Sequence, residues 1–246
     1  MNGQTAYAEV ARTAVDRLLT EEHEAITRAG EMIFRSLRAG GVLQAFGTGH
    51  SRSVALELVG RAGGLVPANQ LGIRDVVYYG DAAPAAILDP KIEREPGLAE
   101  RIWELADIRP EDAFVIISNS GGNASVVEMA RLAADRGHTV IAITSRAHTN
   151  RITGRERLAD LAHVVIDNGA PYGDATVELP GGDAVCPVSN LTGVLIAQLL
   201  VAEVAGRYVA EGVAPPVFRS ANTPGGDVHN DRLLAGYGRR VRLGDA

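Results

Sequence analysis

The chain has 246 residues and a formal net charge of −6, from 24 basic and 30 acidic side chains. Its 46% apolar residues suffice for the core of one large domain or two small ones. The mildly acidic balance argues against a surface for nucleic acid or an anionic membrane. No apolar run approaches the roughly 18 residues that cross a bilayer, so we expect no membrane-spanning segment.

The cysteine and histidine content indicates in which cellular compartment the protein works and whether it holds a metal. A single cysteine, Cys186, excludes an internal disulfide framework and favours a reducing compartment. The six histidines are spread along the chain without a Cys/His cluster, so we expect no metal site. The first 19 residues lack the apolar block of a secretory signal. We therefore expect a cytoplasmic protein that works without a cofactor.

Helical and strand patterns alternate along the first two thirds of the chain. Residues 4–39 carry apolar side chains at helical spacing, with Thr20 as a possible cap of a second helix inside the segment. Short apolar runs follow, separated by amphipathic helical stretches such as 125–135 and 151–162. This alternation predicts right-handed crossovers and a parallel sheet covered on both faces, an α/β fold. The predicted strands are 42–46, 65–68, 113–118, 139–144 and 163–167.

The last third of the chain has a different composition. Residues 169–187 are rich in Gly and Pro and are predicted as a loop before a long apolar helix at 189–211. The prolines and glycines of 213–246 predict an irregular wrap with little helix of its own. We divide the chain into an N-terminal helical arm (1–40), an α/β domain (41–212) and a C-terminal tail (213–246), all forming one structural unit.

Two turns that combine glycine with serine each follow a predicted strand and precede a predicted helix. They are Gly47-Thr48-Gly49-His50-Ser51 and Ser118-Asn119-Ser120-Gly121-Gly122-Asn123. Glycines allow close backbone approach to a ligand, while serine hydroxyls and helix-start N–H groups donate to a dianion. Ligands of open parallel sheets bind beyond the carboxyl ends of the strands. The two turns together therefore predict a phosphate site that needs no lysine.

This pair of turns resembles the sugar isomerase (SIS) domain, a family that binds phosphosugars, and the resemblance covers about residues 30–212. It implies a three-layer αβα fold with a five-stranded, flavodoxin-like parallel sheet. It also implies a homodimer or tetramer with the site between subunits, and a sugar 6-phosphate as ligand, with neither nucleic acid nor membrane as partner. It assigns phosphate binding to Ser51, Ser118, Asn119, Ser120 and Asn123, and the composition of the two turns adds Gly47, Thr48, Gly49 and Gly121 to the expected substrate and phosphate site.

Catalytic enzymes of this family remove a proton α to a carbonyl, usually with a glutamate on the helix after the first loop. The candidate base here is Glu57, whose surroundings resemble the Glu-Leu-x-Gly-Arg of phosphoheptose isomerases. Glu57 lies six residues after Ser51, however, where the family often has ten. The alternative for Glu57 is a helix carboxylate paired with Arg61 at i,i+4. A second acid–base group is also needed, and the candidates are His50, Glu93 or its neighbour Glu95, and His229, which could reach across a dimer.

The resemblance leads to a sequence-based hypothesis for the reaction. The expected substrate is an amino or N-acetylamino hexose 6-phosphate, such as N-acetylglucosamine 6-phosphate, deprotonated at C2. The enediolate can then expel water or another C3 substituent (dehydratase or lyase), or be reprotonated at C1 (isomerase). The offset of Glu57 favours elimination. The other alternative is a non-catalytic phosphosugar sensor, and acidic residues within 1–40 disfavour a DNA-binding regulator.

Overall fold

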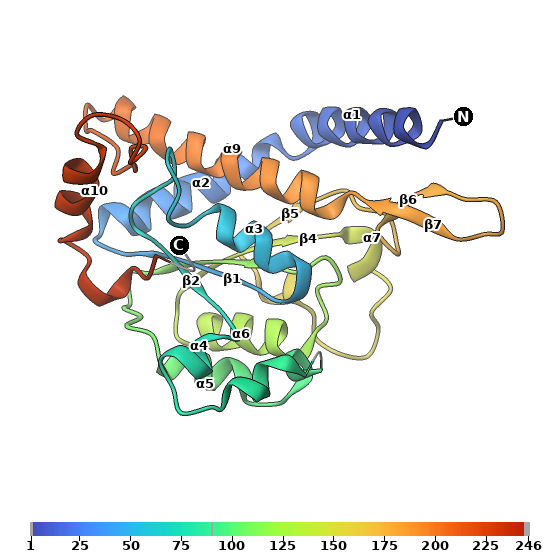
Figure 1. Ribbon diagram of the computed structural model, residues 1–246, viewed down its shortest axis with the longest axis horizontal. Helices are drawn as coiled ribbons and strands as arrows, with labels where there is room; N and C mark the ends of the chain where they lie inside the picture. The colour runs from blue at the N-terminus through green and yellow to red at the C-terminus, as the bar shows by residue number, and fades with distance from the viewer. Residues whose placement is uncertain (1, 90, 244–246) are drawn as a thin grey trace.

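A computed structural model describes residues 2–89 and 91–243 (Figure 1). Residue 1 of the predicted arm and residues 244–246 of the predicted tail lie outside the described residues. Five parallel strands form a sheet in the order β2-β1-β3-β4-β5, which confirms the α/β fold with a flavodoxin-like sheet. The strands are β1 (Leu43–Gly47), β2 (Ala68–Leu71), β3 (Ala113–Ile117), β4 (Thr139–Thr144) and β5 (Val164–Asp167).

Strand β2 differs most from the sequence prediction. Residues 65–67 of the predicted run precede the strand, which begins at Ala68, and the C-terminal tail pairs with Leu65 and Val66. Leu65 forms an antiparallel bridge with Val217, and the amide of Val66 donates to the carbonyl of Pro216 at 2.8 Å. The strand itself carries Asn69, whose side-chain amide donates to Gln44 of β1 at 2.8 Å. A partner from the far end of the chain thus overrides the local apolar pattern.

Helices cover both faces of the sheet in three layers (Figure 1). Helix α6 (Ala124–Asp135) agrees with its prediction to within one residue, whereas the helix predicted at 151–162 is reduced to α8 (Leu158–Leu161), because Gly154 adopts a φ of +71° in an irregular segment. A short helix, α7 (Arg146–Thr149), follows β4. The helices of one face are α2 (His23–Arg38), α3 (Arg52–Glu57) and α9 (Ser189–Ala210). Those of the other are α4 (Asp75–Tyr78), α5 (Leu98–Glu104), α6 (Ala124–Asp135) and α8 (Leu158–Leu161).

Helix α9 corrects the expectation that no segment is long and apolar enough to cross a membrane. Within the described residues it is the one helix that passes this test by length and composition, with a mean hydropathy of 1.5. It packs against α2 and α3, and Gly193 brings it close to α3, since a Cβ there would lie 2.8 Å from Val54 Cγ2. Ile196, Leu200 and Val204 are buried. Its apolar side chains therefore fill the core of this face.

The N-terminal helix and a β-hairpin project together from the body (Figure 1). Helix α1 (Gly3–Glu21) is capped by Asn2, and the chain breaks at Glu22 before α2. The expected cap at Thr20 is wrong, because its hydroxyl donates back to Asp16 within α1. Beside α1, strands β6 (Ala175–Glu178) and β7 (Ala184–Pro187) form an antiparallel hairpin where a loop was predicted. The Pro-Gly-Gly sequence between these strands was a hairpin signal.

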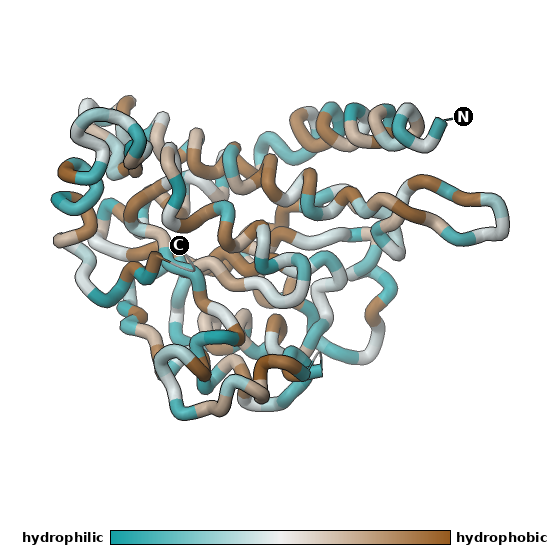
Figure 2. Tube along the Cα trace, in the orientation of Figure 1, coloured by the Kyte–Doolittle hydropathy of each residue, from teal (hydrophilic) through white to brown (hydrophobic). Residues whose placement is uncertain are grey.

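The C-terminal tail crosses the amino ends of the strands. Contrary to the expectation of an irregular wrap, it contains the nine-residue helix α10 (Gly226–Leu234) and a 3-10 turn at Gly238–Arg240. Arg240 is buried and lies 2.5 Å from Asp112, which precedes β3. Figure 2 shows hydrophilic residues alternating with apolar ones along this tail, which matches a segment that covers the body with one side.

Candidate functional site

The two glycine–serine loops leave neighbouring strands at paired residues. The register of β1 and β3 sets Gly47 opposite Ile117. Loop 1, residues 47–51, runs from β1 through a 3-10 turn into α3, and loop 2, residues 118–123, runs from β3 to the start of α6. The strand order reverses between β1 and β3. Both loops therefore lie at the topological switch point, where open α/β sheets bind ligands.

Loop 1 is a tight turn that excludes a side chain at its first residue. A Cβ on Gly47 would lie 2.7 Å from the carbonyl oxygen of Ser51 and 3.2 Å from that of Ile117. Gly49 has a φ of +53°, a conformation that other residues rarely adopt. The amide of Ser51 donates to the carbonyl of Thr48 at 3.1 Å. These constraints place Ser51 directly before the first residue of α3.

Loop 2 is held by its own serines and by the neighbouring strands. The hydroxyl of Ser118 accepts from the amide of Gly121 at 3.1 Å, whereas that of Ser120 accepts from Gly122 at only 3.5 Å. Gly121 has a φ of +67°, and a Cβ there would lie 2.6 Å from Thr149 Oγ1. Since 3.5 Å is beyond the usual range for such bonds, the Ser120 hydroxyl is weakly held and available to another partner.

A pocket of about 350 Å³ adjoins loop 1. Two arginines and two carboxylates face it, so their formal charges cancel, and three isoleucines supply an apolar wall. Such a mixture of apolar lining and a few converging polar groups is typical of a small-molecule site. The sequence prediction missed Arg52 and Arg74 because nothing in their local pattern marks them as pocket residues. The lining residues are Gly47, Thr48, Gly49, Arg52, Ile73, Arg74, Ile87, Asp89, Ile92 and Glu93.

Glu93 lies between the two loops at this pocket and is bonded to loop 2. Its Oε1 accepts from the side-chain amide of Asn123 at 3.0 Å, and its Oε2 lies 3.7 Å from the position of a Cβ on Gly49. The adjacent Ile92 is buried and anchors the segment in the core. Of the predicted acid–base candidates, Glu93 is the one that lines the pocket, whereas Glu95 is exposed.

Glu57 faces α9 and is not one of the pocket-lining residues. Its side chain is 19% exposed, and Oε1 accepts from the amide of Gln198 at 2.6 Å. It also forms the predicted ion pair with Arg61. Gln198 was missed by the sequence analysis, although a lone amide within the apolar run of α9 was a signal. The carboxylate is thus held by one hydrogen bond between helices and one ion pair within α3 and the residues after it.

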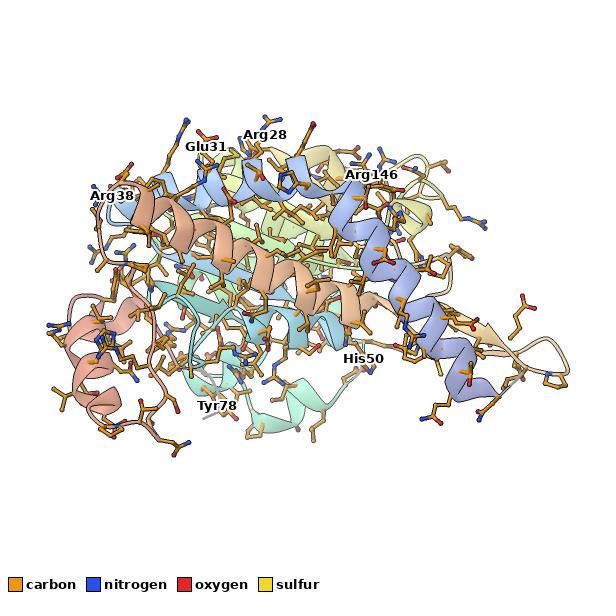
Figure 3. The ribbon with its side chains drawn as sticks, turned by 90° about the horizontal axis from the view of Figure 1, so that it is seen from above. Arg28, Glu31, Arg38, His50, Tyr78 and Arg146 are labelled. Atoms are coloured by element: carbon orange, nitrogen blue, oxygen red, sulfur yellow. The ribbon has the colours of Figure 1, made fainter. Side chains whose placement is uncertain are left out.

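The two histidine candidates lie at opposite ends of the molecule. His50 is exposed in loop 1, near the start of α9 (Figure 3). The hydroxyl of Ser53 donates to the His50 carbonyl at 2.7 Å and accepts from Asn190 of α9 at 3.0 Å. His229 lies on α10, with Nε2 3.0 Å from the carbonyl of Val217, beyond the amino ends of the strands. Within one chain, His229 is not brought to the loops.

A buried carboxylate lies beneath the pocket arginines. Burial raises the pKa of Asp75, while the nearby guanidinium groups of Arg242, Arg74 and Arg52 oppose that shift. Asp75 Oδ2 accepts from the amide of Gly72 at 3.1 Å, and Arg242 Nη1 of the tail lies 3.8 Å from the same oxygen. Arg242 of the tail thus contacts the buried carboxylate that lies next to the pocket arginines. Across residues 2–89 and 91–243, no group of three His, Cys, Asp or Glu side chains is arranged to hold a metal.

Comparisons with known proteins agree with this geometry. A family model described as the SIS domain matches residues 6–145. A UPF0309 protein of Listeria monocytogenes serotype 4b is 33% identical over 242 residues, covering 96% of each chain. One of Brucella canis is 39% identical over 224 residues, covering 90% of this chain and 89% of its own.

Solved structures show the same fold. The phosphoheptose isomerase of Francisella tularensis matches with a TM-score of 0.57 and 17% identity, over 81% of this chain and 95% of its own. That of Neisseria gonorrhoeae matches with a TM-score of 0.55 and 19% identity, over 82% and 96%. At these identities the likeness concerns the fold.

Proposed function

This chain belongs to the SIS-domain family, and we propose that it is an enzyme acting on a sugar phosphate bound at loops 1 and 2. The observation that carries the proposal is the position of these two glycine–serine loops on either side of the switch point, next to a pocket with apolar and charged walls. The names of the structural neighbours, phosphoheptose isomerases, support the same ligand class.

In this proposal, loops 1 and 2 hold the phosphate. The hydroxyls of Ser51, Ser118 and Ser120 donate to its oxygens, and the amide groups at the start of α6 face it. Helix α6 has 12 residues, so its N-terminal partial charge favours an anion. The pocket arginines, Arg52 and Arg74, add positive charge. This arrangement explains how a chain with a single lysine could bind a dianion.

Glu57 is the proposed base for the proton at C2. It lies six residues beyond Ser51 along α3, a rise of roughly 9 Å at 1.5 Å per residue. The base must also be separated from the phosphate, because C2 and the 6-phosphate lie at opposite ends of the hexose carbon chain. Its partial burial and the hydrogen bond from Gln198 hold the carboxylate in one orientation. The second acid–base group is His50 or Glu93 of the same chain, or His229 of a partner subunit in a homodimer.

The proposed reaction is elimination from an amino or N-acetylamino hexose 6-phosphate, such as N-acetylglucosamine 6-phosphate. Glu57 takes the C2 proton, the electron pair of that bond forms the C2=C3 double bond, and the C3–O bond breaks. The leaving hydroxide takes a proton from the second group and departs as water. The alternative is isomerisation of a sugar phosphate that carries a hydroxyl at C2, in which the enediolate is reprotonated at C1. We place the reaction in the cytoplasm, consistent with the single free thiol of Cys186.

One observation favours a second function, that of a non-catalytic sensor. The Glu57 carboxylate is engaged by Arg61 and Gln198 and is not one of the residues that line the pocket. A chain that binds the phosphosugar without turnover would need no free base. Ligand-induced thermal stabilisation without any change of the ligand would support the sensor.

A substrate panel followed by NMR tests the proposal. The purified protein is incubated with hexose, hexosamine and N-acetylhexosamine 6-phosphates and with the same sugars lacking phosphate. The proposal expects new vinylic signals from a phosphorylated N-acetylamino sugar, or, for the isomerase alternative, ketose signals from a hexose 6-phosphate, and none from the unphosphorylated forms. Unchanged spectra with every phosphosugar would contradict an enzymatic role, and equal turnover without phosphate would contradict the phosphate site.

A further inference from the structure

A negatively charged side chain occupies the space between the two loops to which the proposed function assigns a phosphate. The Glu93 carboxylate accepts a 3.0 Å hydrogen bond from Asn123, the last residue of loop 2. Its other oxygen lies 3.7 Å from the Cβ position of Gly49 in loop 1. A carboxylate and a phosphate use the same donors, because both accept hydrogen bonds from amides and hydroxyls.

The charges around the pocket add electrostatic repulsion to this competition between Glu93 and a phosphate. Arg52 and Arg74 contribute two positive charges, and Asp89 and Glu93 contribute two negative ones. With Glu93 ionised, a negative charge lies beside the proposed phosphate position, and removal of that charge lowers the electrostatic repulsion of a dianion. At separations of a few ångströms, one unit charge changes the energy of a dianion substantially even at a high effective dielectric constant.

The attachment of Glu93 to the body is suited to such a role. The preceding residue, Ile92, is buried in the core beside α6, so the backbone of the turn is fixed. The side chain itself is half-buried and, within residues 2–89 and 91–243, makes one hydrogen bond to a side chain, that from Asn123. Rotation of Glu93 can therefore release the Asn123 amide without moving the buried anchor.

We infer that Glu93 is a positioning residue whose carboxylate accepts the hydrogen bond of the Asn123 side-chain amide in the absence of ligand. The phosphate of the substrate displaces the carboxylate and takes over this donor. This inference rests on the proposed phosphate site and goes beyond it. Glu93 lowers the affinity for a dianion by its charge and by competing for the Asn123 amide. A group that serves as an acid–base catalyst would instead change turnover and leave phosphate affinity unaltered.

The test measures the dissociation constant of a hexitol 6-phosphate by calorimetric titration. This probe has the phosphate but no carbonyl, so it cannot be turned over. The variants are Glu93→Gln, which removes the charge, Glu93→Ala, which also removes any partner for Asn123, and the control Glu100→Gln. Glu100 is exposed on α5 and does not line the pocket. The uncharged hexitol serves as the ligand control.

Both Glu93 variants are expected to bind the hexitol phosphate roughly tenfold more tightly than the wild type, with the control unchanged. Equal or weaker binding by both variants, with wild-type binding intact, would overturn the inference and leave the phosphate site standing. A wild type and variants that all fail to bind would overturn the phosphate site itself, and the inference with it.

Discussion

The side-chain amide of Gln198 donates a 2.6 Å hydrogen bond to the carboxylate of Glu57 and thereby joins the middle of α9 to the end of α3. Glu57 also pairs with Arg61, four residues along the chain. A carboxylate with only the ion pair would be a surface feature worth about 0.5 kcal/mol. The second contact, made by the one amide in an otherwise apolar stretch of α9, fixes Glu57 in a single orientation.

Replacing Glu57 by Gln should abolish turnover and spare binding. The amide is close in shape but cannot accept the C2 proton, so the rate should fall by about 10²-fold or more. The dissociation constant of a hexitol 6-phosphate should stay within about twofold, because the phosphate loops are untouched. Rates come from NMR time courses, with Glu100→Gln as the control. Retained activity in the Glu57→Gln variant would show that Glu57 is not the base and would make Asp89 and Glu93 of the pocket the next candidates.

The two serines of loop 2 should respond differently to alanine. Ser118 accepts from the buried amide of Gly121, so Ser118→Ala should lower the free energy of unfolding by about 1–3 kcal/mol and weaken phosphosugar binding as well. Among the described residues, the Ser120 hydroxyl makes only the 3.5 Å contact, so Ser120→Ala should weaken binding with an effect on stability below about 0.5 kcal/mol. Urea unfolding and calorimetry separate the two effects. A Ser120→Ala protein with wild-type affinity would argue against a phosphate on this loop.

The buried pair of Arg240 and Asp112 should hold the tail to the body. Arg240 is 6% exposed and donates to both Asp112 and the Gly40 carbonyl. Arg240→Met leaves the buried carboxylate without its cation and should lower the free energy of unfolding by about 3–5 kcal/mol. The matched control is Arg239→Met, at an exposed neighbour. Urea denaturation in which both variants unfold alike would show that the tail is not held by this pair.

The pH dependence of the free energy of unfolding should reveal the raised pKa of Glu22, the buried carboxylate between α1 and α2. Burial raises the pKa of Glu22 above its ordinary value of 4.5, although the amide of Asp167 donates to it and Arg146 lies nearby. The folded state therefore binds this proton more tightly than the unfolded state, so the stabilisation is complete below pH 4.5 and is lost as the pH rises through the raised pKa. Relative to Glu22→Gln, the wild type should lose stability over that range.

Thermal or urea unfolding of both proteins between about pH 4 and pH 8 measures this difference, because most other titrating groups cancel in the comparison. Glu24→Gln, at an exposed position on α2, is the control and should show a flat difference. A flat difference for Glu22→Gln as well would contradict the raised pKa of Glu22.

The sheet could be predicted closely where the strands are buried on both faces and their own residues are apolar. Strand β4 begins and ends where the sequence analysis set it, β3 and β5 differ by one residue at one end, and β1 is shifted by one residue along the chain. Strand β2 could not be predicted in this way. Its polar residue Asn69 is buried and hydrogen-bonded to Gln44, and the apolar residues before the strand pair with the C-terminal tail. Contacts between segments so far apart in the sequence leave no trace in local periodicity.

The same distinction applies to the site. The glycine–serine loops are local patterns, and the structure places them at the carboxyl ends of adjacent strands. The pocket charges come from α3, from the residues after β2 and from the segment before α5, so their convergence on one pocket depends on the tertiary fold. The link from Glu93 to Asn123 likewise spans 30 residues. The roles of Glu57, His50, Glu93 and His229 remain predictions from family resemblance.

A crystal structure of the protein with N-acetylglucosamine 6-phosphate, using the Glu57→Gln variant to prevent turnover, tests the phosphate site most directly. The account predicts the phosphorus between the two loops, with phosphate oxygens about 3 Å from the hydroxyls of Ser51 and Ser120. A ligand seated elsewhere, for example in the groove between α1 and the β6–β7 hairpin, would contradict it.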